Sequence, residues 1–183
     1  MHQFWATCTK MGGMPPAGAS RGVTAFNLKA DMCTVDEILD AARARVPAQQ
    51  YAGAVTPHEA YELVCSEARV KLIDVRTDAE RDWVGRPALP ESQHGAVQWS
   101  TYPGGVPNAQ FMPQLAALAG KDEVLLFLCR SGVRSRHAAT LAAQHGFAHC
   151  YDILEGFEGD KDAHGHRKSV GGWCRAGLPW LGA

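Results

Sequence analysis

Five apolar residues, Val124 to Leu128, lead directly into a loop that begins with a cysteine and then into an alanine-rich stretch. An uninterrupted apolar run of this length is typical of a strand that is buried on both faces. Two similar runs, Val70 to Val75 and Cys150 to Leu154, also lie next to segments with helical periodicity. Short apolar strands that alternate with helices predict an α/β fold, in which helices cover both faces of a parallel sheet.

Helix starts are marked by a threonine that is followed three residues later by a glutamate. The pattern occurs at Thr34, Thr56 and Thr77. In such a capping box each side chain accepts a hydrogen bond from a backbone N–H group that the helix leaves without a partner. We therefore expect helices over about 34–46, 57–67 and 77–83, a helix capped by Asn108 that runs to Gly120, and a helix that ends near Gln144.

The organisation expected from the sequence is one domain with an N-terminal extension. Residues 1–31 contain Gly12-Gly13 and Pro15-Pro16 and show neither strand nor helix periodicity, so we expect them to be disordered. An N-terminal helix and linker are expected over 32–53, and a single domain over 54–183. A chain of 183 residues has room for one such domain with a substantial core.

The composition argues against nucleic-acid and membrane partners. The formal charge is -1, which leaves no general attraction to nucleic acid. No apolar segment is long enough to span a membrane, and the first residues lack the pattern of a secretion signal. The six cysteines contain no C-x-x-C pair, so we expect reduced thiols and a cytoplasmic protein. These cysteines are Cys8, Cys33, Cys65, Cys129, Cys150 and Cys174.

The loop from Cys129 to Arg136 is the candidate active site. It follows a predicted strand at the carboxyl edge of the sheet, where α/β proteins bind their ligands. Successive backbone N–H groups, the positive end of the next helix and three arginines all favour an anion there, so we expect a thiolate. Cys129 is predicted to be the nucleophile, and Arg130 and Arg134 are predicted to bind an anionic substrate. The amides of residues 130–134, including Ser131, Gly132 and Val133, are expected to form a cradle around the sulfur.

Other charged residues near the strand ends have a structural interpretation. Asp74 and Arg76 are expected to form an ion pair or a cap that supports the neighbouring loops, and Ser135 is expected to support the cysteine loop. Glu80 and Asp82 are expected to be solvated charges on a short helix. The opposite interpretation of the loop itself is a buried structural cysteine beside solvated arginines.

The polar segment 160–170 contains two acidic and two histidine residues, Asp160, Asp162, His164 and His166. Their spacing matches none of the usual zinc patterns. We expect a surface excursion there and no metal site.

Three motifs in order resemble single-domain rhodanese proteins, the thiosulfate sulfurtransferase-like family. Cys129 to Ser135, with the sequence CRSGVRS, resembles the family's active-site loop. Leu72 to Arg76 resembles its early signature, and Leu154 to Phe157 with Trp173 to Trp180 resembles its closing segment. The resemblance extends from about Val55 to the C-terminus.

The resemblance implies a five-stranded parallel sheet flanked by helices and a two-step reaction. The Cys129 thiolate takes the outer sulfur of a small anionic donor such as thiosulfate. A thiophilic acceptor such as cyanide, or a thiol such as thioredoxin or a small dithiol, then collects it from the Cys129 persulfide. No metal or organic cofactor is needed.

The chain departs from the family pattern at one point. The family usually carries a Gly-His-Ile-x-Gly-Ala stretch after the second strand, whereas here Gly85 is separated from Gly95 by a longer connection. No role is carried over to His94, which precedes that second glycine. The difference affects the rim of the pocket and therefore the donor.

Two alternative functions remain open at this stage. Cysteine phosphatases and arsenate reductases place five residues between cysteine and arginine, whereas four separate Cys129 from Arg134, and Ser135 stands where their arginine would be. The shorter loop suits a sulfur atom better than a bound phosphate. The other alternative is a rhodanese-like module that binds or regulates without catalysis.

Overall fold

The computed structural model describes residues 34–46 and 50–182. The expected disordered extension over 1–31, together with Cys8 and Cys33, lies outside the described residues. The described residues cluster as one compact unit. The boundary expected at residue 53 falls inside this unit, because Gly53 begins the first strand of its sheet.

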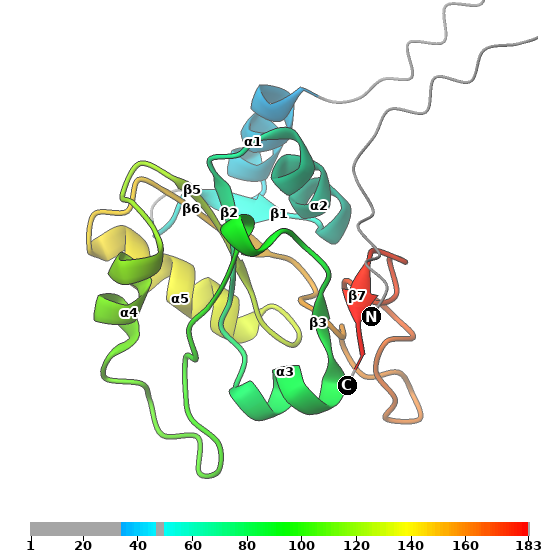
Figure 1. The fold of residues 1–183 in the computed structure, drawn as a ribbon. Helices are drawn as coiled ribbons and strands as arrows, with labels where there is room; N and C mark the ends of the chain where they lie inside the picture. The colour runs from blue at the N-terminus through cyan, green and yellow to red at the C-terminus, as the bar shows by residue number, and fades with distance from the viewer. Residues whose placement is uncertain (1–33, 47–49, 183) are drawn as a thin grey trace, which may run out of the picture. The chain divides into compact units, whose positions relative to one another are not determined.

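A single five-stranded parallel sheet forms the centre of the domain, as the sequence predicts (Figure 1). Its strand order is β1-β6-β5-β2-β4, so β5, which leads into the cysteine loop, is the central strand. The strands are β1 (Gly53–Val55), β2 (Val70–Asp74), β4 (His94–Ala96), β5 (Val124–Leu128) and β6 (His149–Ile153). A separate two-stranded antiparallel sheet joins β3 (Arg86–Pro87) to β7 (Trp180–Leu181).

The predicted capping boxes all form. Thr34, Thr56 and Thr77 each accept a hydrogen bond from the glutamate N–H three residues on, and each glutamate side chain accepts one in return. The expected cap at Asn108 is wrong: its side chain accepts from the N–H of Gln110, and the helix begins only at Phe111. The helices are α1 (Val35–Ala44), α2 (Pro57–Ser66), α3 (Asp78–Val84), α4 (Phe111–Leu118), α5 (Val133–Gln144) and the short η1 (Glu91–Gln93).

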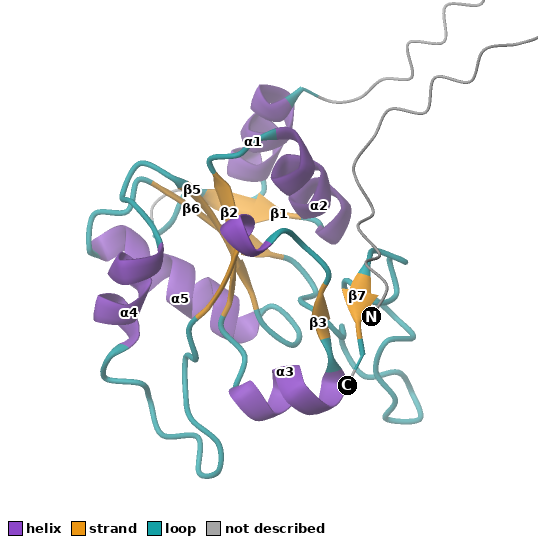
Figure 2. Ribbon diagram, in the orientation of Figure 1, coloured by secondary structure: helices purple, strands orange, loops and turns teal. Residues whose placement is uncertain are grey.

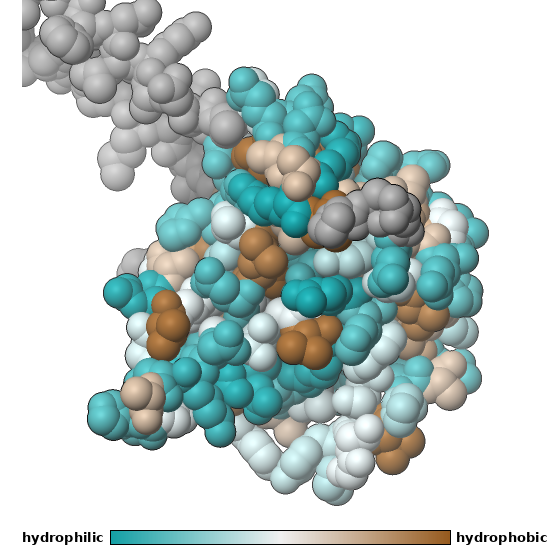
Figure 3. All heavy atoms as spheres, turned by 180° about the vertical axis from the view of Figure 1, so that it is seen from behind, coloured by the Kyte–Doolittle hydropathy of each residue, from teal (hydrophilic) through white to brown (hydrophobic). Residues whose placement is uncertain are grey.

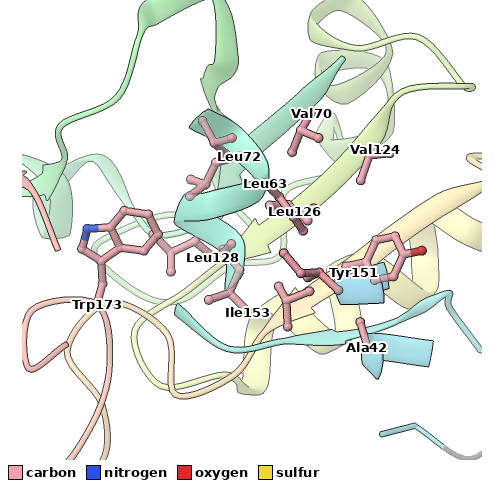
Figure 4. Packing of buried hydrophobic residues seen from close by; sticks show 14 of the residues in the cluster. Ala42, Leu63, Val70, Leu72, Val124, Leu126, Leu128, Tyr151, Ile153 and Trp173 are labelled. Atoms are coloured by element: carbon pink, nitrogen blue, oxygen red, sulfur yellow. The ribbon is translucent and has the colours of Figure 1, made fainter. Parts of the chain in front are cut away.

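Helices cover both faces of the sheet (Figure 2). Successive side chains of a strand point to opposite faces, so Leu126 and Leu128 pack with α1 and α2 on one face while Leu125 and Phe127 pack with α4 and α5 on the other. Figure 4 shows the first of these cores, where side chains from β2, β5 and β6 meet Leu63 of α2. Two fully packed cores hold the central strand in place and fix the point at which Cys129 leaves it.

The polar segment 160–170 leaves the domain and returns to it. Lys168 donates its N–H to the carbonyl of Glu158 at 2.7 Å, and Trp173 donates to Gly156 at 2.8 Å, so the two ends lie side by side. Inside the segment, the Asp162 carboxylate accepts from the N–H groups of His164 and His166.

The surface of the described residues is mainly polar. Seen from behind, the apolar side chains form separate small patches on a largely hydrophilic face (Figure 3). Within the described part of the chain, the helices are too short or too polar to cross a membrane.

Candidate active site

The cysteine loop connects β5 to α5, as the sequence predicts. Cys129 directly follows β5, and α5 begins at Val133. Gly132 precedes the helix with a φ of 91°, in the left-handed region that favours glycine. The positive end of α5 therefore lies beside the cysteine and favours negative charge there.

Two polar groups of the loop face the Cys129 sulfur. The N–H of Gly132 donates to Sγ at 3.1 Å, and the Ser135 hydroxyl lies 3.2 Å from Sγ, where either atom can be the donor. Gly132 thus supplies one amide of the expected cradle, and the roles of the other loop amides stay predictions. The Ser135 contact gives its supporting role a physical basis.

Cys129 is a buried residue of the core on the α4 and α5 side of the sheet. Cys129 is 1% exposed and Ser135 is fully buried. The surroundings of Sγ are nevertheless polar on the side of the loop, which distinguishes Cys129 from a cysteine surrounded only by apolar groups.

The segment that follows β6 supports the cysteine loop through backbone hydrogen bonds. Phe157 donates its N–H to the carbonyl of Cys129 at 2.8 Å, and Glu158 donates to Arg130 at 3.0 Å. Gly156 has a φ of 65°, and a Cβ atom there would lie 2.5 Å from the Cys129 carbonyl oxygen. Only glycine allows the two backbones to approach so closely.

Asp74 and Arg76 form the ion pair that the sequence predicts. Arg76 Nη2 lies 2.7 Å from Asp74 Oδ2, and neither side chain is exposed. The same Nη2 atom donates to the carbonyl of Gly85 at 2.9 Å, and the guanidinium carbon lies 4.1 Å from the centre of the Phe157 ring. Arg76 therefore connects the end of β2, the end of α3 and the segment after β6 that supports the cysteine loop.

Glu80 lies in a different environment from the one that the sequence predicts. It is not a solvated helix charge, because its carboxylate accepts two hydrogen bonds from Arg134, at 2.7 and 2.8 Å. Burial opposes ionisation of Glu80, but the bonds from Arg134 and from the N–H and hydroxyl of Thr77 outweigh it and lower the pKa of Glu80 to about 2. Arg134, expected to bind the substrate, is thus already held by a carboxylate.

The other two arginines of the loop point to different surroundings. Arg130 is exposed at the surface. Arg136 lines a cavity of about 430 Å³ together with Arg45 and Tyr51. This cavity is lined by none of the residues from Cys129 to Ser135, so its shape says nothing about access to the sulfur.

Comparison with known proteins identifies the family. The family described as the rhodanese-like domain matches residues 56–163. The chain belongs to the rhodanese-like domain family. The uncharacterized protein RP600 of Rickettsia prowazekii is 32% identical over 124 residues, which cover 67% of this chain and 91% of that protein. The thiosulfate sulfurtransferase GlpE of Haemophilus influenzae is 29% identical over 125 residues, which cover 68% and 90% of the two chains.

Solved structures agree with this assignment. The crystal structure of Rv0390 from M. tuberculosis is 40% identical, covers 73% of this chain and 99% of its own, and superposes with a TM-score of 0.67. The polysulfide-sulfur transferase of Wolinella succinogenes shares the fold, at 21% identity and a TM-score of 0.51, with 79% and 85% of the two chains covered.

One acidic residue of this rhodanese-like domain was missed by the sequence analysis. Asp152 lies within β6 and is fully buried, and neither of its carboxylate oxygens makes a hydrogen bond within the described residues. Burial raises the pKa of Asp152 to about 6, although Ser135 and Arg136 oppose the rise. A carboxylate inside the run Cys150 to Leu154, which is otherwise apolar or aromatic, was the available signal.

The acidic and histidine residues of the polar segment interact within their own loop. In residues 34–46 and 50–182, no group of three or more histidine, cysteine, aspartate or glutamate side chains is placed to hold a metal ion. Asp162 is instead engaged by backbone N–H groups of its own loop.

Of the other described cysteines, Cys65 is exposed, whereas Cys150 and Cys174 are buried or partly buried. Burial raises the pKa of Cys150 to about 12 and also raises the pKa of Cys174. Neither thiol is suited to act as a nucleophile at neutral pH.

Proposed function

We propose that this rhodanese-like domain is a sulfurtransferase that carries a sulfane sulfur as a persulfide on Cys129. The observation that carries the proposal is the position of Sγ at the start of α5, in contact with the Gly132 N–H and the Ser135 hydroxyl. Hydrogen-bond donors and a helix N-terminus at this point stabilise a thiolate. The names of the GlpE relative and of the Wolinella structure, both sulfur-transfer proteins, support the same chemistry.

The proposed reaction has two displacements at sulfur. In the first, the Cys129 thiolate attacks the outer sulfur of thiosulfate, a new S–S bond forms, and the old S–S bond breaks as sulfite leaves with its electron pair. In the second, an acceptor nucleophile attacks the outer sulfur of the persulfide. Cys129 then leaves as the thiolate, so the cycle needs no external oxidant or reductant.

The arginines of the loop have different parts in this proposal. Arg130 is exposed, so it is placed to attract and orient a small anionic donor. Arg134 is bound to Glu80, so it contributes from a fixed position, and part of its charge is neutralised. A thiol acceptor, either thioredoxin or a small dithiol, and a reducing cytoplasmic location complete the proposal.

The direct test is mass spectrometry of the protein after incubation with thiosulfate. The expected result is an adduct of about 32 Da on the peptide that contains Cys129, released by cyanide as thiocyanate. Cys129→Ser should lose the adduct and all sulfur transfer, whereas Cys174→Ala should keep both.

The same experiment separates the alternatives. A folded protein that forms no adduct with thiosulfate, mercaptopyruvate or polysulfide supports the non-catalytic module. Hydrolysis of p-nitrophenyl phosphate that depends on Cys129 supports the phosphatase. If sulfur transfer occurs, rates with thiosulfate and mercaptopyruvate, each with cyanide or thioredoxin as acceptor, identify the preferred pair.

A further inference from the structure

Four large apolar side chains are exposed at the edge of the sheet where the cysteine loop lies. Trp83 is 72% exposed and Tyr102 is 63% exposed, and Val106 and Val133 are also open to solvent. They belong to the segments that follow β2, β4 and β5, which are neighbouring strands of the sheet. Because these strands are parallel, their carboxyl ends share one edge. We call these four residues the apolar rim.

Two of the three segments are held side by side, namely α3 and the connection 97–108 (Figure 1). The Gln98 side chain accepts a hydrogen bond from the N–H of Asp78 at 3.0 Å and donates one to its carboxylate at 2.7 Å. The rings of Trp83 and Tyr102 pack edge to face, with their centroids 6.1 Å apart. The aromatic pair of the apolar rim is therefore held by its own contact although both rings are open to solvent.

Both of these segments also contact the segment that carries the cysteine. On α3, the Glu80 carboxylate accepts two hydrogen bonds from Arg134. In the connection, the Trp99 ring lies 6.4 Å from the ring of His137 in α5. Glu80 and Trp83 are three positions apart, so they are neighbours on the surface of α3. The apolar rim therefore borders the cysteine loop.

The form of the apolar rim fits a protein better than a small molecule. Small ligands bind in concave pockets that bury most of their surface. The members of the apolar rim instead project into solvent from three separate segments. Single exposed apolar residues are ordinary, whereas a group of them beside a candidate active site indicates an interaction surface. Tryptophan and tyrosine are also the residue types that most often contribute to protein interfaces.

The cysteine segment gives this surface a positive charge. Residues 124–151, which include the cysteine loop and α5, contain no aspartate or glutamate. The guanidinium groups of Arg130 and Arg136 are both exposed. Electrostatic attraction acts over about 8 to 10 Å at moderate ionic strength, so charges around the loop contribute to the field at its surface.

The acidic residues of α3 do not cancel this charge. Asp78 is paired with Arg81, and Glu80 is paired with Arg134. Asp82 is exposed, so it sets one negative charge against the two exposed arginines. The complementary partner surface is therefore apolar at its centre and acidic beside its reactive group.

We propose that the apolar rim is the docking surface for a protein that presents a thiol on an apolar, acidic surface and collects the sulfur from Cys129. This proposal rests on the proposed function, because it names the class of acceptor for the persulfide. The partner thiolate attacks the outer sulfur, a new S–S bond forms, and the old S–S bond breaks as Cys129 leaves as the thiolate. In a dithiol partner, the second thiolate then attacks the inner sulfur of the partner persulfide. A disulfide forms and hydrosulfide leaves, so the dithiol is oxidised and the transferred sulfur is reduced.

The test compares two sulfur acceptors in the full chain, with thiosulfate as the donor. Reduced thioredoxin is the protein acceptor and is followed by the release of hydrosulfide, whereas cyanide is the small acceptor and is followed by thiocyanate. Trp83→Ala removes the most exposed ring of the apolar rim. It should raise the KM for thioredoxin about ten-fold and leave kcat and KM for cyanide within about two-fold of the original values.

A matched pair of variants controls for the effect of a surface substitution. Val106 and Val170 are each 60% exposed, but Val170 lies in the polar segment 160–170. Val106→Asp places a negative charge in the apolar rim and should also raise the KM for thioredoxin about ten-fold, whereas Val170→Asp should leave it unchanged. Thermal unfolding of each variant establishes that it is folded.

The proposal is overturned if Trp83→Ala and Val106→Asp use thioredoxin as well as the original protein does, or if they lose the cyanide reaction to the same extent. It is also overturned if the original protein uses cyanide but not thioredoxin. A dimer in size-exclusion chromatography that Trp83→Ala separates would instead assign the apolar rim to a second copy of this chain. The cyanide reaction of the original protein tests the proposed function separately, because only its absence together with inactivity toward thioredoxin contradicts that function.

Discussion

Two buried or partly buried carboxylates lie in the elements around the cysteine loop, Glu80 in α3 and Asp152 in β6, and within the described residues only Glu80 has a loop side chain, Arg134, as its hydrogen-bond partner. Glu80 receives two hydrogen bonds from a guanidinium and its pKa falls to about 2. Asp152 has no such partner, and burial raises its pKa to about 6. The hydrogen-bond partner, and not burial alone, therefore decides the state of a carboxylate: Glu80 stays ionised and anchors the loop to α3, whereas Asp152 can take up a proton near neutral pH.

The largest expected effect comes from a pair that is buried more completely than either carboxylate. Arg76→Met leaves Asp74 charged and without its guanidinium in a site with no exposure. The free energy of unfolding should fall by about 3 to 5 kcal/mol, measured by urea denaturation. This loss is the upper limit with which the effect of breaking the Glu80–Arg134 pair is compared. A loss below about 1 kcal/mol in Arg76→Met would show that the Asp74–Arg76 pair contributes little to stability.

Removing the charge of Glu80 should lower the stability by a smaller amount, and the loss should depend on pH. Glu80→Gln should lower the free energy of unfolding by about 2 kcal/mol at pH 7. The folded pKa is depressed, so the stabilisation is complete above the unfolded value of about 4.5 and is lost as the pH falls toward about 2. Melting curves of both proteins should therefore converge in strong acid; a gap that persists at pH 2 would assign the effect to packing.

Removing the charge of Asp152 should have the opposite effect and raise the stability of the domain. Its folded pKa is raised from 3.8 to about 6, so its ionisation costs stability as the pH rises through this range. Asp152→Asn removes that cost and should stabilise the domain by about 1 to 2 kcal/mol at pH 7, with no difference below pH 4. A variant that is less stable than the original at pH 7 would reveal a partner for Asp152 that stabilises its charge.

The smallest energy should be the coupling between the Glu80 and Asp152 substitutions. Glu80 and Asp152 share no hydrogen-bond partner in the described residues. The effects of Glu80→Gln and Asp152→Asn on stability should therefore add within about 0.5 kcal/mol in the double variant, as chemical denaturation can measure. A larger coupling energy would mean that the cysteine loop transmits changes between Arg134 and the surroundings of Asp152.

The sequence predicted the parts of the molecule that depend on local rules. The capping boxes at Thr34, Thr56 and Thr77 fix helix starts through residues three positions apart. The apolar run Val124 to Leu128 predicted the strand β5, and the turn into α5 placed Cys129 at the carboxyl edge of the sheet. Asp74 and Arg76 are two positions apart, so the sequence could also predict their pairing.

The sequence could not predict contacts that depend on how distant elements meet. Glu80 and Arg134 are 54 positions apart, and nothing in the short helix around Glu80 shows which cation it will face. Asp152 lies opposite Phe127, two residues before Cys129, only because β6 pairs with β5 in the sheet. In both cases the local pattern was visible, but the partner was set by tertiary packing.

The polar segment between Gly159 and Gly171 has a practical consequence. Hydrogen bonds between Lys168 and Glu158 and between Trp173 and Gly156 close its base. Lys168 also donates to the carbonyl of Val84 and lies over the Trp180 ring, so the returning part of the segment is attached to the domain, whereas the tip around His164 is held by Asp162 of the same segment. A short epitope or reporter peptide inserted at this tip should therefore be tolerated without disturbing the fold around Cys129.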